Sequence, residues 1–279
     1  MRQVIIQTDF GTGSVSVSAM HGVCAVVHPD LRVDDGNNAV KQFDVLSASD
    51  SLMYLLPYWP QGSVFVSVVD PGVGTSRRSC VALLKNGQYV VTPDNGTLTY
   101  IKERIGIEAV REIDESVNRM PGSEDVHIFH GRDVYAYCAA RLAAGIIDFE
   151  GVGPEYPVDE VVEVPYLKPG KEGGAVFGMI NEADPYYGLI DTNIPFGWLS
   201  ESGMVYGDTV TVTVENNGEK VLELPLKLEK TFGCVPVGDP LIFSSEMRTV
   251  MMAINQGNAA ETYGIGDGTS WKFTVRKGQ

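Results

Sequence analysis

The chain has 279 residues, 44% of them hydrophobic and 20% charged, which is the composition of a globular protein with a sizeable buried core. Its 36 acidic residues outnumber the 21 basic ones and give a net charge of −15, so the surface repels phosphate backbones, which argues against a nucleic-acid partner. No stretch approaches 18 apolar residues and no basic leader precedes the first strand-like segment, so we expect no membrane partner and a cytoplasmic location.

Strand-like and helix-like segments alternate through the first half of the chain. Short runs rich in β-branched residues predict strands at Val4–Gln7, Val64–Val69, Tyr89–Val91 and Ile128–Phe129. Apolar residues near helical spacing predict helices at Ser16–His28, Ala48–Trp59 and Val134–Ala144, the last ended by Gly145. This alternation predicts an α/β N-terminal domain with a largely parallel sheet over residues 1–163.

The character of the sequence changes after residue 163. Prolines and glycines crowd residues 164–174, VPYLKPGKEGG, which predicts a linker. Residues 175–279 contain short alternating runs, two of them joined by Asn217-Gly218, a strong hairpin signal, and two more within LIFSSEMRTVMMAI. They predict a smaller, mostly β C-terminal domain.

Four predicted strands of the first domain each end in a polar side chain closely followed by glycine. The four polar residues are Asp9, Asp70, Asp94 and His130. Because ligands of an open α/β sheet bind at the carboxyl ends of its strands, these endings predict one shared site. Glycine at such positions lets the backbone turn sharply and approach a ligand closely.

The segment SVVDPGVGTSRR brings Arg77 back to Asp70 within seven residues. A loop that returns a guanidinium to a carboxylate at a strand end favours a functional pair over a turn. Structural alternatives stay open for the other endings: Asp9 as a helix cap, Asp94 as a turn residue, and His130 as a core histidine. For Arg132-Asp133 a capping or ion-pair role is favoured over chemistry.

Several other kinds of site are not supported by the sequence. In HIFH, His127 and His130 would point to opposite faces of a strand, and no third ligand has metal spacing, so we expect no metal site. Cys24, Cys80, Cys138 and Cys234 form no CxxC pair, and we expect them reduced in or near the core. The motifs GxxxxGK[ST], GxGxxG and GxSxG are absent.

Six blocks occur in order along nearly the whole chain: TDFGT (8–12), VVDPGVGTSRR (68–78), TPDNG (92–96), FHGRDVYA (129–136), ADPYYGLIDTNIP (183–195) and AINQGNAA (253–260). Together they resemble the signature of the S-adenosyl-L-methionine (SAM) hydroxide adenosyltransferase family. These are adenosine-forming SAM hydrolases, related to the SAM-dependent fluorinase and chlorinase.

The resemblance implies hydrolysis of SAM to adenosine and L-methionine, with SAM as the substrate and no cofactor. It implies a barrel-like C-terminal domain and a homotrimer, in which SAM lies between the first domain of one subunit and the second domain of its neighbour. The implied catalytic trio falls on Asp70, Arg77 and His130. The implied substrate-binding positions fall on Asp9, Ser16, Phe43, Asp184, Tyr187, Phe232 and Ser245.

Several points stay open at the level of sequence. A carbon–sulfonium bond breaks to a neutral thioether, so the reaction needs an aligned and activated water more than a general acid, and either Asp70 or His130 could be the base. The alternatives are a halogenase of the same superfamily and a non-catalytic SAM- or adenosine-binding protein. The chain also departs from the family pattern, with Leu189 where an amide is expected and Glu246 where glycine is expected near the methionine site.

Overall fold

The computed structural model describes residues 1–278, which form two compact units, Met1–Val164 and a second one beginning at Pro165. In the described residues, no helix is long and apolar enough to cross a membrane.

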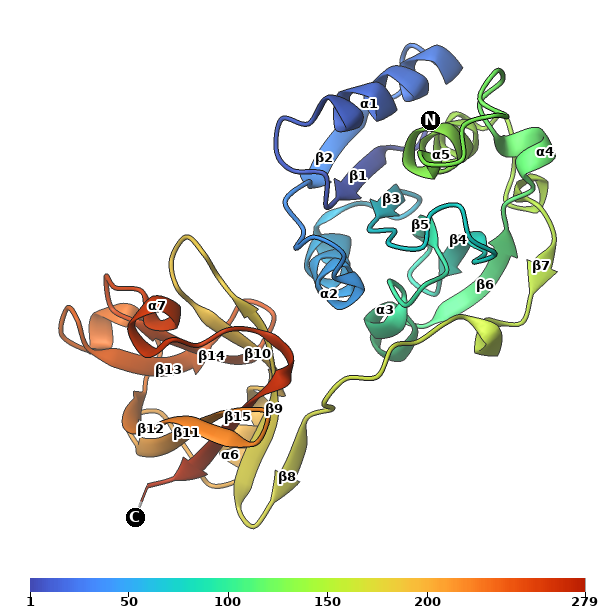
Figure 1. The fold of residues 1–279 in the computed structure, drawn as a ribbon. Helices are drawn as coiled ribbons and strands as arrows, with labels where there is room; N and C mark the ends of the chain where they lie inside the picture. Colours follow the sequence, from blue (N-terminus) through green and yellow to red (C-terminus); the bar gives the residue numbers. More distant parts are fainter. Residues whose placement is uncertain (279) are drawn as a thin grey trace. The chain divides into compact units, whose positions relative to one another are not determined.

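The first unit is an α/β domain (Figure 1). Its strands are β1 (Val4–Thr8), β2 (Val33–Asn37), β3 (Val64–Val68), β4 (Ser79–Leu84), β5 (Tyr89–Pro93), β6 (Ile107–Glu112) and β7 (Glu155–Tyr156). Its helices are α1 (Val15–Val27), α2 (Val45–Leu55), α3 (Thr99–Arg104), α4 (Glu115–Asn118) and α5 (Tyr137–Ala144), with short 3-10 turns at Leu56–Tyr58, Glu150–Val152 and Val158–Glu160. The strand order is β2-β1-β3-β5-β4-β6-β7. The first four strands in this order, β2, β1, β3 and β5, are mutually parallel. Each of the next three, β4, β6 and β7, runs antiparallel to the strand before it. The predicted α/β class is therefore confirmed.

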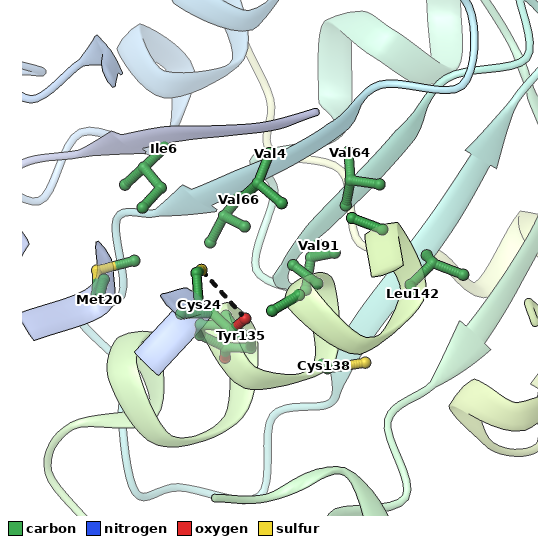
Figure 2. Packing of buried hydrophobic residues seen from close by; sticks show 14 of the residues in the cluster. Val4, Ile6, Met20, Cys24, Val64, Val66, Val91, Tyr135, Cys138 and Leu142 are labelled. Carbon is green, nitrogen blue, oxygen red and sulfur yellow. Dashed lines mark hydrogen bonds between the residues drawn. The ribbon is translucent and has the colours of Figure 1, made fainter. Parts of the chain in front are cut away.

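The central strands are apolar on both faces because helices cover both. In β1, Val4 and Ile6 pack with α1 and α5, whereas Ile5 between them packs on the other face with Leu52 of α2. Figure 2 shows the first of these cores, where the thiol of Cys24 donates a hydrogen bond to the carbonyl of Ala136 at 3.7 Å. Both cores fix the strand ends that carry the site.

One predicted strand does not form. Residues 126–129 are irregular, and Ile128 is 84% exposed, so this segment has no apolar face to bury in a sheet. It leads into a π-helical segment, η2 (Gly131–Ala136), which continues as α5 and ends at Gly145 with the expected left-handed backbone (φ 74°). His130 therefore lies at a helix start and not at a strand end. π-helical turns are common at functional sites.

The second unit is a closed barrel of seven strands. Its strands are β8 (Gly170–Glu172), β9 (Ala175–Ala183), β10 (Ile190–Pro195), β11 (Thr209–Asn216), β12 (Glu219–Leu228), β13 (Pro240–Ser244), β14 (Thr249–Ile254) and β15 (Gly268–Lys277), with α6 (Gly197–Glu201), a 3-10 turn at Phe232–Cys234 and α7 (Ala259–Tyr263). The order β10-β14-β13-β12-β11-β15-β9 closes on itself through pairing of β9 with β10, and β8 extends from β9. The predicted mostly β, barrel-like C-terminal domain is confirmed.

The hairpin expected at Asn217-Gly218 joins β11 to β12, and both residues have positive φ (51° and 82°) as a tight primed turn requires. A second such turn lies inside the predicted linker. Gly173 and Gly174, also with positive φ, connect β8 to β9, so the end of that segment is part of the sheet.

The cysteine prediction holds for three residues of four. Cys24, Cys80 and Cys138 are free and buried, and burial raises the pKa of Cys24 and of Cys138 to about 12, which keeps both thiols protonated. Cys234 is exposed, contrary to expectation, because it lies in the short 3-10 turn between β12 and β13.

Two of the sequence blocks meet at Gly188 in the barrel. The carbonyl of Gly188 accepts hydrogen bonds from the backbone N–H groups of Ala259 and Ala260 at the start of α7. Gly188 has a φ of 64°, and a Cβ at this position would lie 2.0 Å from Oδ1 of Asn258, the residue that caps α7. The turn 184–188 therefore fits against α7 only with glycine at 188.

We expect Gly188→Ala to destabilise the protein more than Gly203→Ala, by roughly 1–3 kcal/mol. Both positions have left-handed backbone, but a Cβ at Gly203 would meet no atom within 4 Å beyond its chain neighbours, so that substitution carries only the backbone strain. Urea unfolding followed by circular dichroism measures both free energies. Equal losses would show that contact with Asn258 is not what requires glycine.

Candidate active site

A cavity of about 370 Å³ lies beside the ends of β1 and β3. Its lining residues are Asp9, Phe10, Ser14, Ser16, Gln42, Phe43, Val68, Asp70, Val73, Ile128, Phe129, His130 and Gly131. The structure thus brings together, around one cavity, five of the sequence-predicted site residues: Asp9, Ser16, Phe43, Asp70 and His130. A polar cavity at the carboxyl end of a parallel sheet is where an α/β fold binds its ligand.

Asp70 and Arg77 form a bidentate ion pair. Nε of Arg77 donates to Oδ1 of Asp70 at 2.9 Å, and Nη2 donates to Oδ2 at 2.6 Å. The loop between them is closed by a hydrogen bond from Thr75 Oγ1 to the Gly72 carbonyl, with left-handed backbone at Gly74. The Asp70 side chain is only 6% exposed, so the pair is nearly desolvated and its geometry is tightly held. The predicted return of Arg77 to Asp70 is thus observed directly.

Tyr135 and Ser79 complete this pair, and sequence reasoning missed both. The Tyr135 hydroxyl lies 3.4 Å from Oδ2 of Asp70 and 3.2 Å from Oγ of Ser79, and Nη1 of Arg77 donates to the same Oγ at 3.0 Å. Burial, together with the nearby Asp70 charge, raises the pKa of Tyr135 well above its usual value, so its phenol keeps its proton. For Tyr135 the only signal in the sequence was its position inside the block FHGRDVYA, and Ser79 had none.

His130 lies next to this network, with its ring 6.5 Å from that of Tyr135. Nε2 of His130 is 3.7 Å from Oε1 of Glu115 and 3.5 Å from Nη2 of Arg119, whereas Nδ1 is buried and has no hydrogen-bond partner in the described residues. Burial lowers the pKa of His130 below its usual value, although the Glu115 carboxylate opposes this shift. His130 is therefore neutral at pH 7 and has a nitrogen able to accept a proton.

Asp9 and Phe43 are coupled through the backbone. Oδ2 of Asp9 accepts a hydrogen bond from the Phe43 N–H at 2.9 Å, and Phe43 has a positive φ of 65°. The Phe43 ring is 64% exposed at the edge of the cavity. Ser16 lies in the first turn of α1, whose N-cap is Ser14. The cavity is thus lined by the carboxylate of Asp9, the hydroxyl groups of Ser14 and Ser16, and the aromatic ring of Phe43.

Two details of the predicted site are wrong. Asp94 does not line the cavity: its carboxylate accepts hydrogen bonds from Tyr156 Oη (3.0 Å) and the Val162 N–H (2.9 Å), which anchors the end of the first unit. His127 and His130 do not lie on opposite faces of a strand, because no strand forms there and both line a second cavity. In residues 1–278, no three His, Cys, Asp or Glu side chains are placed to hold a metal ion.

Arg132 and Asp133 form the ion pair that was favoured for them. Nε of Arg132 donates to Oδ1 of Asp133 at 2.6 Å, and the Asp133 side chain is fully buried. This pair stabilises the start of the helix that carries Tyr135.

The remaining predicted residues lie in the barrel. Asp184 directly follows β9 and caps its own turn, with Oδ1 accepting the Tyr186 N–H at 2.7 Å, and Tyr187 is exposed in that turn. Phe232 contacts Phe243, with ring centroids 4.9 Å apart. Ser245 is buried, and its hydroxyl is bonded to that of Thr249 at 2.6 Å, so its role inside the barrel is to hold the β13–β14 turn.

Fold and site together define an α/β protein with a polar cavity at the strand ends, joined to a seven-stranded barrel. The chain belongs to the SAM hydroxide adenosyltransferase family: it matches the N-terminal domain of that family over residues 4–153 and the C-terminal domain over residues 178–272. The predicted family resemblance is thereby confirmed.

Individual relatives agree with this assignment. The chain is 33% identical to an (R)-S-adenosyl-L-methionine hydrolase from Thermus thermophilus, over 96% of this chain and 98% of the relative. It is 26% identical to a fluorinase from an Actinoplanes species, over 97% of both chains. An uncharacterized conserved protein from Thermotoga maritima has a crystal structure with a TM-score of 0.89 and 31% identity, over 99% of this chain and 100% of the other.

We expect Arg77→Met to cost about 3–5 kcal/mol of stability, because it leaves the buried Asp70 carboxylate without its cation. Arg78→Met is the matched control. Arg78 pairs with Glu160 at the surface, so its loss is expected to cost no more than about 1 kcal/mol. Thermal unfolding of both variants tests this, and equal effects would contradict a buried, structurally dominant pair at Arg77.

Proposed function

We propose that the protein hydrolyses SAM to adenosine and L-methionine by attack of water on the 5′ carbon. The observation that carries this proposal is the arrangement of Asp70, Arg77 and His130 next to a cavity that also contains Asp9. Membership of the family and the names of the hydrolase relatives support the same reaction. SAM is the substrate, and the proposed reaction has no step for a cofactor.

The geometry favours His130 over Asp70 as the base. Both oxygens of Asp70 accept hydrogen bonds from Arg77, and one also faces the Tyr135 hydroxyl. Neutral His130 has an unpartnered Nδ1. In the proposed step a water O–H bond breaks, its proton passes to His130, the oxygen bonds to C5′, and the C5′–S electron pair returns to sulfur. Arg77 favours the developing negative charge on the water oxygen.

The roles proposed for the other residues follow from their chemistry. The Asp9 carboxylate suits the two ribose hydroxyls, since an ionised acid accepts strong hydrogen bonds, and Phe43 lies beside it to cover the sugar. Ser16 is proposed for the amino-acid end. In the barrel, Asp184 is proposed to receive the methionine ammonium, Phe232 and Tyr187 to contact adenine, and Ser245 to support the methionine side through its turn.

Incubation of the protein with SAM in oxygen-18 water tests the proposal. We expect labelled adenosine with the label at the 5′ oxygen, and a loss of roughly 10²–10³ in kcat for Asp70→Asn, because Arg77 loses the carboxylate that orients it. Asp35→Asn is the control, because Asp35 forms a surface pair with His21 away from the cavity. Supplying the (R) and (S) sulfonium epimers separately shows whether the preference stated in the relatives' name applies here.

Two outcomes would refute the proposal. Formation of 5′-chloro- or 5′-fluoroadenosine with added halide, in place of adenosine, would assign the chain to halogenation, the activity named for its fluorinase relatives. Unchanged SAM after long incubation, with SAM still bound, would indicate a non-catalytic binding protein.

We further propose a homotrimer in which the barrel of one subunit completes the cavity of its neighbour. Apolar side chains exposed at the cavity, Phe43 and Ile128, support an interface there. If Asp70→Asn and Asp184→Ala are each inactive, their co-expressed mixture should recover about one quarter of the wild-type activity, because that share of randomly assembled sites combines two intact halves. No recovery, or a monomer in analytical ultracentrifugation, would contradict this assembly.

A further inference from the structure

A second cavity, of about 480 Å³, shares His130 with the first. Its lining residues are Gly74, Thr75, Glu115, Ser116, Arg119, Glu124, His127 and His130. The imidazole of His130 thus lines two separate cavities, one containing Asp9 and Asp70 and the other containing charged side chains that the proposed hydrolysis does not use.

Glu115 is held rigidly within this second cavity. Its Oε2 accepts hydrogen bonds from Nη2 of Arg119 at 2.5 Å and from Nε at 3.1 Å, across one turn of helix. Nη1 of Arg119 donates to the backbone carbonyls of Ser123 and Val126, each at 3.2 Å. Arg119 is thereby tied to the loop that leads to His130, and its side chain is only 10% exposed. The carboxylate consequently has little freedom to turn away.

The other oxygen of Glu115 faces His130. Oε1 lies 3.7 Å from Nε2, which is longer than a direct hydrogen bond but within reach of a bridging water or a small closure when the ring becomes charged. Nη2 of Arg119, which bonds Glu115 at 2.5 Å, also donates a longer hydrogen bond to Nε2 at 3.5 Å. A guanidinium can only donate, so Nε2 of the neutral ring accepts this bond, and the Glu115 carboxylate lies close enough to stabilise the ring once it carries a second proton.

We propose that Glu115, oriented by Arg119, is a positioning residue that stabilises the imidazolium formed when His130 takes a proton from the attacking water. The inference rests on the proposed hydrolysis. No bond to Glu115 forms or breaks; the proton moves from water to the unprotonated nitrogen of the ring, and the carboxylate balances the resulting charge. A carboxylate behind a histidine base acts in this way in other hydrolases.

The charges around His130 determine the expected signs. Glu115 and Asp70 raise its pKa, whereas Arg77, Arg119 and burial lower it. The Tyr135 phenol stays protonated and adds no charge, and His127 lines the same second cavity. Removing Glu115 should therefore lower the pKa of His130 further, and removing Arg119 should raise it.

Glu115→Gln tests the proposal against Glu124→Gln, a carboxylate in the same cavity that accepts hydrogen bonds from the backbone N–H groups of Gly122 and of Glu124 itself. Because the neutral imidazole is the active form, the acid limb of kcat/KM should move to lower pH in Glu115→Gln and to higher pH in Arg119→Met. We expect kcat to fall roughly 10- to 100-fold in Glu115→Gln, with KM little changed. Glu124→Gln should match the wild type. General structural damage would shift the acid limbs of Glu115→Gln and Arg119→Met in the same direction.

A direct readout separates this proposal from the proposed function. Proton NMR titration of the histidine ring signals, with His130 assigned through His130→Asn, gives the pKa of His130 whether or not SAM is hydrolysed. A lower pKa in Glu115→Gln and a higher one in Arg119→Met support the positioning role. Unchanged values in both overturn it, even if the wild type forms adenosine. Absence of adenosine from the wild type would instead refute the hydrolysis.

Discussion

The buried ion pair between Asp70 and Arg77 is the interaction on which the rest of the site depends. Two charges taken out of water are stable only when their hydrogen bonds are satisfied. Here the carboxylate is bound through both oxygens, and Ser79 and Tyr135 surround the pair. The pair therefore requires the tight loop 71–76 to bring Arg77 back beside Asp70. It also requires the helical segment that carries Tyr135 to begin at a position that brings the Tyr135 hydroxyl to the same carboxylate. That helix start is the position of His130.

The geometry of the same pair also bears on the roles proposed for Asp70 and His130. A carboxylate bound through both oxygens has few lone pairs free, and the guanidinium that it holds is an oriented positive charge. Under the proposed function, Asp70 contributes by fixing Arg77, and proton transfer is left to the neutral imidazole nearby. Sequence reasoning left open which of Asp70 and His130 is the base, and our proposal of His130 rests on contacts that no spacing of residues reveals.

Sequence reasoning succeeded where the signal was local and failed where it depended on tertiary contacts. The strand ends at Asp9 and Asp70, the return of Arg77 and the Asn217-Gly218 hairpin follow from turn chemistry and hydrophobic pattern. The short run VHIF resembles a strand by composition, but its exposed Ile128 has no sheet to join. Asp94 also follows a strand, yet it binds Tyr156 and Val162, which are more than 60 residues away along the chain.

Glu115 and Arg119 show why the second set of residues around His130 was missed. Their spacing of four within a helical segment is typical of a surface ion pair of little consequence. Only the tertiary structure brings Oε1 of Glu115 to the imidazole. The sequence predicts a solvent-facing pair, but the structure partly encloses it. In this enclosed position the charge of Glu115 acts on the pKa of His130 more strongly than it would in water.

One departure from the family pattern lies against an apolar cluster of the barrel. Leu189, where an amide was expected, packs against a cluster formed by Val235, Leu241, Phe243, Met251 and Ala253. Leu189 is only partly buried, and the apolar side chains that it contacts offer no hydrogen-bond partner to an amide at this position. Phe243 in this cluster also contacts Phe232. Under the proposed function, the barrel would therefore recognise adenine through contacts with aromatic rings more than through a side-chain amide. Ring contacts distinguish adenine from other bases less sharply than hydrogen bonds do.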